Sequence, residues 1–383
     1  MINSDVAVVM GTRPEMIKLV HVVRQLGDRV RLIHTGQHFD DELSGQIQSS
    51  LGLPHPDVVL KDVGGQSRSR QIATCMQAIS EEFDRQKPAV AIVQGDTNTV
   101  SAAAQAANYA GVPLIHVEAG LRSFDRAMPE EINRLVAGAL ADVHCAATEA
   151  NRWNLASSGT DSDTIALTGN TIVEATHASL AFADSQGPHS TLDKWGNTDF
   201  ALATIHRPEN TDSAQALERF LAGLAGINLP VLVAAHPRTR AAIERWGLNR
   251  YYGPLTFIDS VPHHDFLRLA RAANLLVSDS GGLQEECTVL KKPLVVVRRS
   301  TERPESIAAG FAQLVTPEQS ISRVANQVLD SNQEHALAAI SSPYGDGLAS
   351  LRIANLASLI ADGSVPSEAI AKTAQTYPLL LNR

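Results

Sequence analysis

Residues 6–20 read VAVVMGTRPEMIKLV, and this stretch decides the class of fold. The five apolar residues Val6–Met10 have the composition of a strand that is buried on both faces. A glycine follows them, and Pro14 can occupy the first turn of a helix, where the missing N–H of proline costs no hydrogen bond. Because a buried strand followed by a turn and a helix is typical of parallel sheets, the stretch predicts an α/β fold.

The same alternation recurs along the chain. Short apolar runs predict further strands at Val30–His34, Ala89–Val93, Pro113–Val117, Asp199–Ile205, Pro230–Ala235, Leu255–Ile258, Leu275–Ser278 and Pro293–Val297. Helical patterns lie between them, as in Glu15–Leu26 and the Ala-rich Asn98–Ala110. Residues 183–197 are polar and rich in turn formers, which indicates a surface connection between two halves. We therefore predict two doubly wound α/β domains with a cleft between them.

The composition excludes several classes of protein. Of 383 residues, 44% are hydrophobic and 19% are charged, which excludes wholesale disorder. The 32 Lys and Arg residues against 41 Asp and Glu residues give a net charge of −9, which is unsuited to covering nucleic acid or an anionic membrane. Cys75, Cys145 and Cys287 lie far apart without CxxC spacing and predict neither disulfides nor a zinc site. No apolar run approaches the ~20 residues of a membrane span, so we expect a soluble, cytoplasmic protein.

The tripeptide Arg-Pro-Glu occurs three times, at 13–15, 207–209 and 303–305, each time after a predicted strand. Each copy places an arginine at the edge where parallel sheets bind ligands, although three coincidental helix starts are the alternative. The first copy follows Gly11, whose turn lets the backbone approach an anion at the helix N-terminus, and the same helix contains Lys18. The alternative there is a tight turn with solvated side chains.

A second motif suited to phosphate, Asp279-Ser280-Gly281-Gly282, follows a predicted strand and opens a helix. Paired glycines at a helix start expose N–H groups that suit a diphosphate, and Ser280 can donate another hydrogen bond. Glu286, one turn into the helix, could accept hydrogen bonds from both hydroxyls of a ribose, and Arg303 could neutralise the diphosphate. A glycine N-cap with acidic residues that complement the helix dipole is the alternative.

Carboxylates follow two neighbouring predicted strands. Asp96 ends one strand and Glu118 ends the next, so both should converge on one cleft, where repulsion and burial raise their pKa values toward a useful acid–base range. Glu130 and Glu131 follow at the start of a helix, and only one of them can face the site because adjacent helical residues point about 100° apart. Ion pairs are the alternative, a fair one for Glu131 and a weaker one for the two strand-end carboxylates; the neighbouring cations are Arg122, Arg126 and Arg134.

Among the histidines, His206 is the candidate for a catalytic role. It ends the predicted strand Asp199–Ile205, and we expect it to face the cleft from the second domain. His116 and His144 fall in predicted strands and are more typical of a core, and the role of His236 stays open. His263-His264-Asp265 has metal-ligand spacing, but without a third convergent ligand we expect no metal.

Ten motifs, in order along the chain, are similar to those of the non-hydrolysing UDP-N-acetylglucosamine 2-epimerases. They are GTRPEMIK at 11–18, TGQHFD at 35–40, QGDTNT at 94–99, HVEAGLRSFD at 116–125, MPEEINR at 128–134, TGNTIVEA at 168–175, HRPEN at 206–210, DSGGLQEE at 279–286, STERPE at 300–305 and PYGDG at 343–347. The resemblance implies a GT-B-type architecture with two Rossmann-like domains, 1–169 and 170–364, and the nucleotide in the cleft between them. It further implies that the tail, about 365–383, packs back on the first domain.

The resemblance also implies the residues of the site. The acid–base positions match Asp96, Glu118, Glu130 and His206. The UDP-binding positions match Arg13, Lys18, Phe266, Ser280, Gly281, Gly282, Glu286 and Arg303, with Phe266 flanking the uracil. An activator site, which some bacterial relatives use for a second substrate molecule, matches Gln37, His38, Arg207 and His236. No cofactor, metal, nucleic acid or membrane is implied, and the expected partners are a UDP-sugar and a second copy of the chain.

Several departures from the family pattern bear on these assignments. The loop from Glu118 to Pro129 is shorter than in some relatives, which leaves the choice between the two adjacent glutamates open. Arg298-Arg299 stand where many relatives have an acidic residue, which leaves the identity of the sugar in the UDP-sugar substrate open. His263-His264 replace an aromatic residue expected near the uracil, and Asp40 departs from the usual activator residue.

The activity that the resemblance implies is reversible epimerisation at C2 of UDP-N-acetylglucosamine to UDP-N-acetylmannosamine, through elimination of UDP to 2-acetamidoglucal and re-addition. The alternatives are an epimerase for a related UDP-2-acetamido sugar, such as a 2,3-diacetamido uronic acid, and a hydrolysing relative that releases N-acetylmannosamine and UDP. A GT-B glycosyltransferase would leave Asp96, Glu118 and Glu130 unexplained, and a nucleotide-sugar sensor would tolerate their loss.

Overall fold

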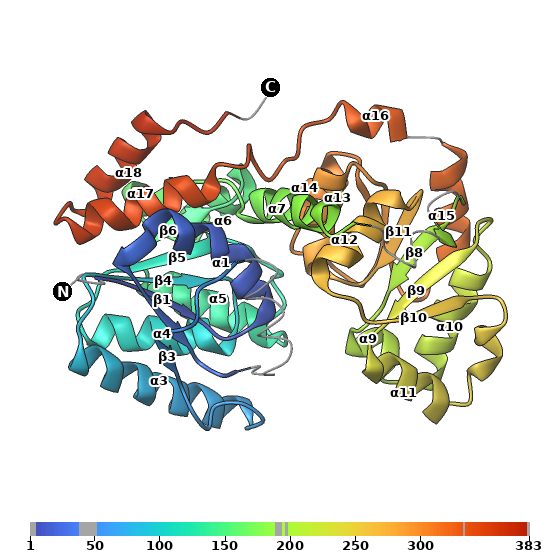
Figure 1. Cartoon of the computed structure of the whole chain (residues 1–383), viewed down its shortest axis with the longest axis horizontal. Helices are drawn as coiled ribbons and strands as arrows, with labels where there is room; N and C mark the ends of the chain where they lie inside the picture. Colours follow the sequence, from blue (N-terminus) through green and yellow to red (C-terminus); the bar gives the residue numbers. More distant parts are fainter. Residues whose placement is uncertain (1–4, 38–51, 188–193, 196–197, 332–333, 381–383) are drawn as a thin grey trace. The chain divides into compact units, whose positions relative to one another are not determined.

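The computed structural model describes residues 5–37, 52–187, 194–195, 198–331 and 334–380, and the chain forms two compact units (Figure 1). Unit 1 comprises Met1–Ala175 together with Tyr344–Arg383, and unit 2 comprises Thr176–Pro343. In the described part of each unit, one sheet of parallel strands is covered by helices. This confirms the predicted pair of doubly wound α/β domains.

The sheet of unit 1 has the strand order β3-β2-β1-β4-β5-β6-β7. The strands are β1 (Val6–Met10), β2 (Val30–His34), β3 (Val58–Val59), β4 (Val90–Gln94), β5 (Leu114–Ala119), β6 (Val143–Ala146) and β7 (Ile165–Leu167). Val6 pairs with Val30 of β2 on one side and with Val90 of β4 on the other, so β1 is a central strand. The strand order reverses between β1 and β4, which is the position where open parallel sheets usually bind ligands.

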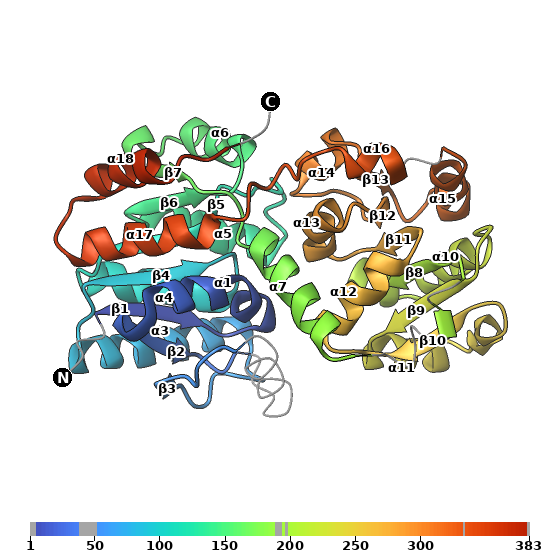
Figure 2. The same ribbon diagram turned by 45° about the horizontal axis from the view of Figure 1, so that its top comes forward.

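Helices cover both faces of this sheet. They are α1 (Arg13–Leu26), α3 (Arg68–Arg85), α4 (Asn98–Tyr109), α5 (Pro129–Leu140), α6 (Glu149–Ser157), α17 (Ala349–Ala361) and α18 (Pro366–Thr376), with short 3-10 turns at Gly27–Arg29 and Ser162–Thr164. The helix α7 (Ile172–Ser185) begins in unit 1 and continues into unit 2. Ala7 and Val9 of β1 pack in one cluster with buried residues of α3, α4 and α5. On the other face, α17 lies against α1, β1 and β4 (Figure 2). The alanines of α4 are buried, which allows this helix to lie close to the sheet and to α3 and α5.

The sheet of unit 2 has the order β10-β9-β8-β11-β12-β13. Its strands are β8 (Ala201–Thr204), β9 (Val231–Ala235), β10 (Thr256–Asp259), β11 (Leu275–Ser278), β12 (Leu294–Val297) and β13 (Ala312–Val315). Its helices are α9 (Pro208–Thr211), α10 (Ala214–Ala225), α11 (Pro237–Arg245), α12 (His263–Ala272), α13 (Gly281–Leu290), α14 (Pro304–Ala308), α15 (Ile321–Asp330) and α16 (Glu334–Ala338), with a 3-10 turn at Asn249–Tyr252. Alternate residues of β8 and β9 belong to two separate apolar clusters, so this sheet is buried on both faces, and its order reverses between β8 and β11.

The boundaries of the units differ from those predicted. The first boundary lies after Ala175, within α7, rather than after residue 169, and the chain returns to unit 1 at Tyr344 rather than at 365. The early return follows from the packing of α17, whose buried Arg352 donates hydrogen bonds to the carbonyls of Thr168 (3.0 Å) and Tyr377 (2.8 Å). The polar segment 183–197 is likewise not the connection between the units, because its first residues complete α7 within unit 2.

The predicted strands differ from the observed ones only at their ends, whereas β3, β7 and β13 were not predicted. β3 and β7 have only two and three residues, too few to produce a distinct apolar run, and Gln313 interrupts the apolar residues of β13. No helix in the described part of the chain is both long and apolar enough to cross a membrane.

Replacement of Arg352 by Met should destabilise unit 1. The side chain is 2% exposed and pairs with Asp346 at 2.6 Å, so its removal leaves a mostly buried carboxylate without this partner. We expect Arg352→Met to lower the free energy of unfolding by about 3 kcal/mol, measured by urea denaturation.

The control is Arg152→Met, because Arg152 is 53% exposed and lies 3.6 Å from Glu149. A surface pair of this kind should contribute less than about 1 kcal/mol. Equal losses for the two variants would contradict the role of Arg352 in holding the returning chain.

Candidate active site

The turn after β1 has no room for a side chain at Gly11. A Cβ atom there would overlap with the hydroxyls of Thr35 and Thr99. The N–H of Gly11 donates to Oε2 of Glu15 at 2.9 Å, and the other carboxylate oxygen accepts from the hydroxyl of Thr97 at 2.7 Å. Glu15 therefore ties the turn after β1, which carries Arg13, to the turn after β4.

Glu15 is a buried carboxyl group. Burial raises its pKa to about 7, although the hydrogen bonds from Thr97 and Gly11 oppose this shift. Near neutral pH the group is thus close to its midpoint between the charged and neutral forms.

Glu118 has an unusual backbone conformation at the end of β5. Its φ of 63° lies in the left-handed region, which costs free energy for a residue other than glycine. The pairing register of β5 with β6 shifts between Val117 and Ala119, so the strand is irregular at this residue. Lys18 of α1 donates to Oε2 of Glu118 at 2.5 Å, and Gln94 of β4 donates to the same oxygen. Lys18, which we predicted to bind UDP, thus contacts a candidate catalytic carboxylate.

A second cluster in unit 1 surrounds Arg134, a buried residue of α5. Its guanidinium contacts Asp96 at 2.5 Å and Glu131 at 2.9 Å. Glu131 also accepts hydrogen bonds from the backbone N–H (2.8 Å) and the hydroxyl (3.0 Å) of Ser123. Burial by itself would raise the pKa of Glu131, but these donors outweigh it and lower the pKa. The ion-pair alternative is therefore correct for Glu131, and Asp96 forms such a pair as well.

Glu130 differs from Glu131 in its surroundings. Glu130 is exposed, whereas Glu131 is 2% exposed and bound to Arg134 and Ser123. The amide of Asn133, one turn into the same helix, donates to the carbonyl of Asp96 at 2.9 Å and so links α5 to the turn after β4.

The two histidines predicted to be core residues are buried and bound to backbone carbonyls. Nε2 of His116 lies 2.8 Å from the carbonyl of Gly95, and Nε2 of His144 lies 2.9 Å from that of Gly138. Burial lowers the pKa of His116 to about 4. Because Gly95 precedes Asp96, His116 supports the turn that carries this carboxylate.

In unit 2, the loop after β8 is held by Asp279, which is fully buried. Asp279 accepts hydrogen bonds from the backbone N–H groups of His206 (3.1 Å) and Arg207 (2.8 Å) and from the amide of Asn210 (3.1 Å). Nδ1 of His206 lies 3.1 Å from the same carboxylate, and the ring is about half exposed. Burial by itself would raise the pKa of Asp279, but its contacts with His206 and the other donors lower it. Sequence reasoning did not assign this anchoring role, although a polar residue that ends an apolar strand is a signal for it.

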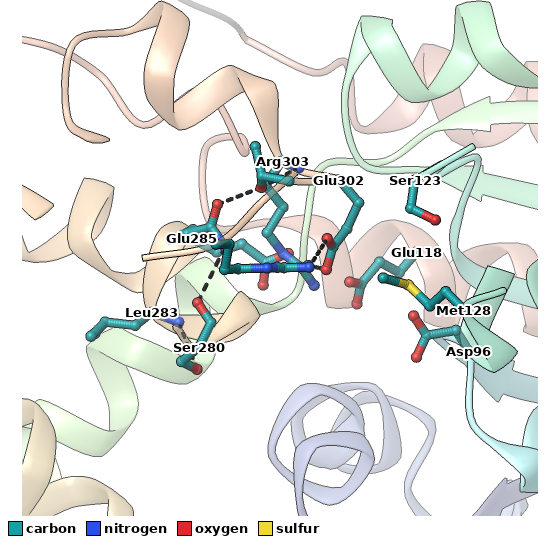
Figure 3. Close-up of polar contacts among 12 residues, drawn as sticks. Asp96, Glu118, Ser123, Met128, Ser280, Leu283, Glu285, Glu302 and Arg303 are labelled. Atoms are coloured by element: carbon teal, nitrogen blue, oxygen red, sulfur yellow. Dashed lines mark hydrogen bonds and ion pairs between the residues drawn. The ribbon is translucent and has the colours of Figure 1, made fainter. Parts of the chain in front are cut away.

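The start of α13 places the N-terminus of a helix beside a cation. Ser280 is the N-cap and accepts a hydrogen bond from the N–H of Leu283 at 3.5 Å (Figure 3). A Cβ atom on Gly281 would lie 2.8 Å from Nη1 of Arg303, so the guanidinium lies directly beside the backbone of this glycine. Gly282 has open space at its Cα, with the hydroxyl of Ser280 4.0 Å from a Cβ built there. A helix N-terminus with an adjacent guanidinium is suited to a phosphate group.

Arg303 is held by buried carboxylates (Figure 3). Its Nε donates to Glu285 at 2.7 Å, and its Nη1 donates to Glu302. Glu302 in turn accepts from the buried Arg298 at 2.8 Å. Of the two arginines that depart from the family pattern, Arg298 therefore supports the position of Arg303, whereas Arg299 is exposed and pairs with Glu318 at 3.2 Å.

The other predicted residues of unit 2 lie on α12, on α13 and after β9. Glu286 of α13 contacts His263 of α12 at 2.7 Å, and Phe266 is partly buried one turn further along α12. Of the predicted activator residues, Arg207 donates from Nε to the carbonyl of Asp279 at 2.9 Å, and His236 is exposed and caps α11.

The remaining activator residues belong to unit 1. Oε1 of Gln37 accepts from the backbone N–H and the hydroxyl of Thr99, both at 2.9 Å, and His38 lies outside the described residues.

Comparisons with known proteins identify relatives along most of the chain. A family model described as UDP-N-acetylglucosamine 2-epimerase matches residues 23–358. The UDP-N-acetylglucosamine 2-epimerase of Methanococcus maripaludis is 34% identical over 366 residues, which cover 92% of this chain and 97% of that protein. The UDP-2,3-diacetamido-2,3-dideoxy-D-glucuronate 2-epimerase of Pseudomonas aeruginosa is 34% identical over 361 residues, covering 90% of this chain and 97% of that protein. The solved structure of Methanocaldococcus jannaschii UDP-GlcNAc 2-epimerase in complex with UDP-GlcNAc and UDP is similar, with a TM-score of 0.77, 34% identity and coverage of 91% and 98%.

Replacement of Glu15 by Gln should change how stability depends on pH. Because the pKa of Glu15 rises from 4.5 to about 7 on burial, the native state binds more protons than the unfolded state between these values. The stabilising contribution of this group is complete below pH 4.5 and is lost as the pH rises through 7. Relative to the wild type, Glu15→Gln should therefore gain about 2 kcal/mol of unfolding free energy between pH 5 and pH 8 in urea denaturation.

Thr97→Val provides the matched control. It removes one hydrogen bond to Glu15 but keeps the carboxyl group, so the pH dependence of the wild type should persist or grow. Stability curves for Glu15→Gln and the wild type that remain parallel across this range would contradict the assignment.

Proposed function

The chain belongs to the UDP-N-acetylglucosamine 2-epimerase family, and we propose that it interconverts UDP-N-acetylglucosamine and UDP-N-acetylmannosamine by inversion at C2. One observation carries the proposal. The chain combines carboxylates at the ends of two adjacent parallel strands, Asp96 and Glu118, with an anion site at the start of α13 beside Arg303. A glycosyltransferase or a sensor would need the anion site but not the pair of carboxylates.

The anion site would stabilise UDP as a leaving group. The hydrogen on C2 of the intact sugar is not acidic, so cleavage of the C1–O bond comes first and its electrons depart with the diphosphate. Backbone N–H groups at Gly281 and Gly282, the hydroxyl of Ser280 and the guanidinium of Arg303 suit that developing charge. Arg13 and Lys18 match further UDP-binding positions of the family, Glu286 would accept from the ribose hydroxyls, and Phe266 would flank the uracil.

Acid–base groups would then complete the inversion. Loss of UDP leaves positive charge at C1, which acidifies C2. A carboxylate removes the C2 proton, and the electrons of the C–H bond form the C1=C2 bond of 2-acetamidoglucal. Return of a proton to the opposite face and re-addition of UDP give the epimer, so groups are needed on both faces. We assign these roles to Asp96, Glu118, Glu130 and His206.

The contacts of the adjacent glutamates support Glu130 rather than Glu131 in this set. A group that exchanges protons during turnover must reach the substrate, and Glu130 is exposed. Glu131 is engaged by Arg134 and Ser123, which lower its pKa and suit it to positioning α5.

A second substrate is favoured by one comparison. The Pseudomonas aeruginosa relative, which acts on a UDP-2,3-diacetamido uronic acid, is as similar in identity as the Methanococcus maripaludis enzyme. The reaction at C2 would be the same, and only the groups at C3 and C6 of the sugar would differ.

Proton NMR of the protein with UDP-N-acetylglucosamine in D₂O tests the proposal. We expect deuterium at C2 together with signals of UDP-N-acetylmannosamine. Free N-acetylmannosamine with accumulating UDP would instead identify a hydrolysing enzyme. No change with this substrate, followed by turnover of the diacetamido uronic acid nucleotide, would establish the second candidate.

We also propose that the chain works in the cytoplasm as a homodimer on a UDP-sugar. The family resemblance supports both statements. We further propose activation by a second substrate molecule, because Gln37, Arg207 and His236 match the activator positions of some relatives. Light scattering coupled to gel filtration should give twice the mass of one chain. A monomer that is fully active would contradict the assembly, and a hyperbolic dependence of rate on substrate would contradict the activation.

Substitutions of the two adjacent glutamates should affect different properties, one the rate of turnover and the other the stability of the fold. Glu130→Gln should lower kcat by about 10²- to 10⁴-fold, because it removes an acid–base group, and should leave the unfolding free energy near that of the wild type. Glu131→Gln should lower the unfolding free energy by about 1 to 3 kcal/mol, because it removes the charge that pairs with buried Arg134. Urea denaturation and steady-state kinetics measure both effects, and the reverse pattern would exchange the two roles.

A further inference from the structure

His263 and Glu286 form a pair that joins α12 to α13. Nε2 of His263 lies 2.7 Å from Oε1 of Glu286, and the side chains are only 15% and 9% exposed. Because a carboxylate oxygen only accepts here, the imidazole carries its hydrogen on Nε2. The other ring nitrogen, Nδ1, is buried and has no hydrogen-bond partner among the described residues. Glu286 is thus the polar contact that orients this ring.

The pair also orients the carboxylate. A glutamate side chain has three rotatable bonds, and its carboxyl plane turns easily unless a neighbour holds it. To accept hydrogen bonds from two adjacent ribose hydroxyls, both carboxylate oxygens must face the same diol. A carboxyl plane that is already fixed therefore loses less entropy on binding. A hydrogen bond from a mostly buried ring to Oε1 provides that restraint. Phe266, expected at the uracil, lies three residues after His263 and so on the same side of α12.

We propose that His263 is a positioning residue for the nucleoside, holding Glu286 in the orientation that accepts from the ribose hydroxyls. The proposal rests on the proposed function, in which Glu286 contacts the ribose of UDP. His263 stands in the segment where the resemblance led us to expect an aromatic residue. In this chain a donor to Glu286 occupies that place, so discrimination between ribose and deoxyribose should depend on His263.

Calorimetric titration of the full chain with UDP and with 2′-deoxyuridine 5′-diphosphate tests the proposal. The wild type should bind UDP more tightly than the deoxy compound. His263→Phe keeps a ring but removes the donor, and it should weaken UDP binding about fivefold, the value of one hydrogen bond. Binding of the deoxy compound should weaken less, so the ratio of the two dissociation constants should fall. His263→Gln, which retains an N–H donor, should restore most of the ratio and so distinguishes a lost hydrogen bond from a disturbed fold.

His264→Phe is the matched control. His264 neighbours His263 on α12, but its ring packs edge-on against Phe182 with centroids 4.9 Å apart, so this variant should keep the ratio of the wild type. In turnover, His263→Phe should raise KM more than it lowers kcat, because the ribose is remote from the reacting carbon.

The outcomes separate this proposal from the one on which it rests. A wild type that does not bind UDP would overturn both. UDP binding with an unchanged ratio in His263→Phe would overturn the positioning role alone. Tighter UDP binding by His263→Phe would also overturn it, since His263 would then compete with the ribose for Glu286.

Discussion

The site in unit 1 depends on the buried ion pair between Lys18 and Glu118. A buried carboxylate without a partner costs several kcal/mol, and the left-handed backbone at Glu118 adds strain. Lys18 can reach this carboxylate because the turn at Gly11 is tight enough to start α1 directly after β1. Gln94, at the end of β4, contacts the same oxygen. Side chains of α1 and β4 thus hold a carboxylate that β5 carries.

In unit 1 a buried cation holds a candidate carboxylate, whereas in unit 2 buried carboxylates hold a candidate cation and a loop. Its buried carboxylates serve as anchors, and the groups they hold are the ones that would meet the nucleotide. Asp279 accepts hydrogen bonds from the backbone of the loop that carries His206. Glu285 and Glu302 hold the guanidinium of Arg303, which lies beside Gly281. Each unit therefore holds its own candidate groups through contacts within the chain, and groups held in this way would need little reorganisation during the proposed reaction.

Local patterns were enough to predict the alternation of strands and helices, because most of the described strands are short apolar runs bounded by turn residues. They also placed Asp96 and Glu118 at the ends of neighbouring strands. The pairing of Lys18 with Glu118 could not be predicted, since the partners are far apart in sequence. The burial of Glu131 against Ser123 and Arg134, which supports the proposed role of Glu130, could not be predicted either. The return of the chain at Tyr344 depends on contacts of Arg352 with residues 168 and 377, which no local pattern encodes.

In the reaction that we propose, the C1–O bond breaks before C2 is inverted, and ¹⁸O exchange tests this order most directly. UDP-N-acetylglucosamine would carry ¹⁸O in the bridge between C1 and the β-phosphorus. If UDP leaves and returns, rotation of its terminal β-phosphate moves the label into non-bridging positions, which ³¹P NMR resolves. We predict that this exchange accompanies deuterium incorporation at C2. Deuterium incorporation with the label retained in the bridge would contradict elimination and require a direct proton abstraction.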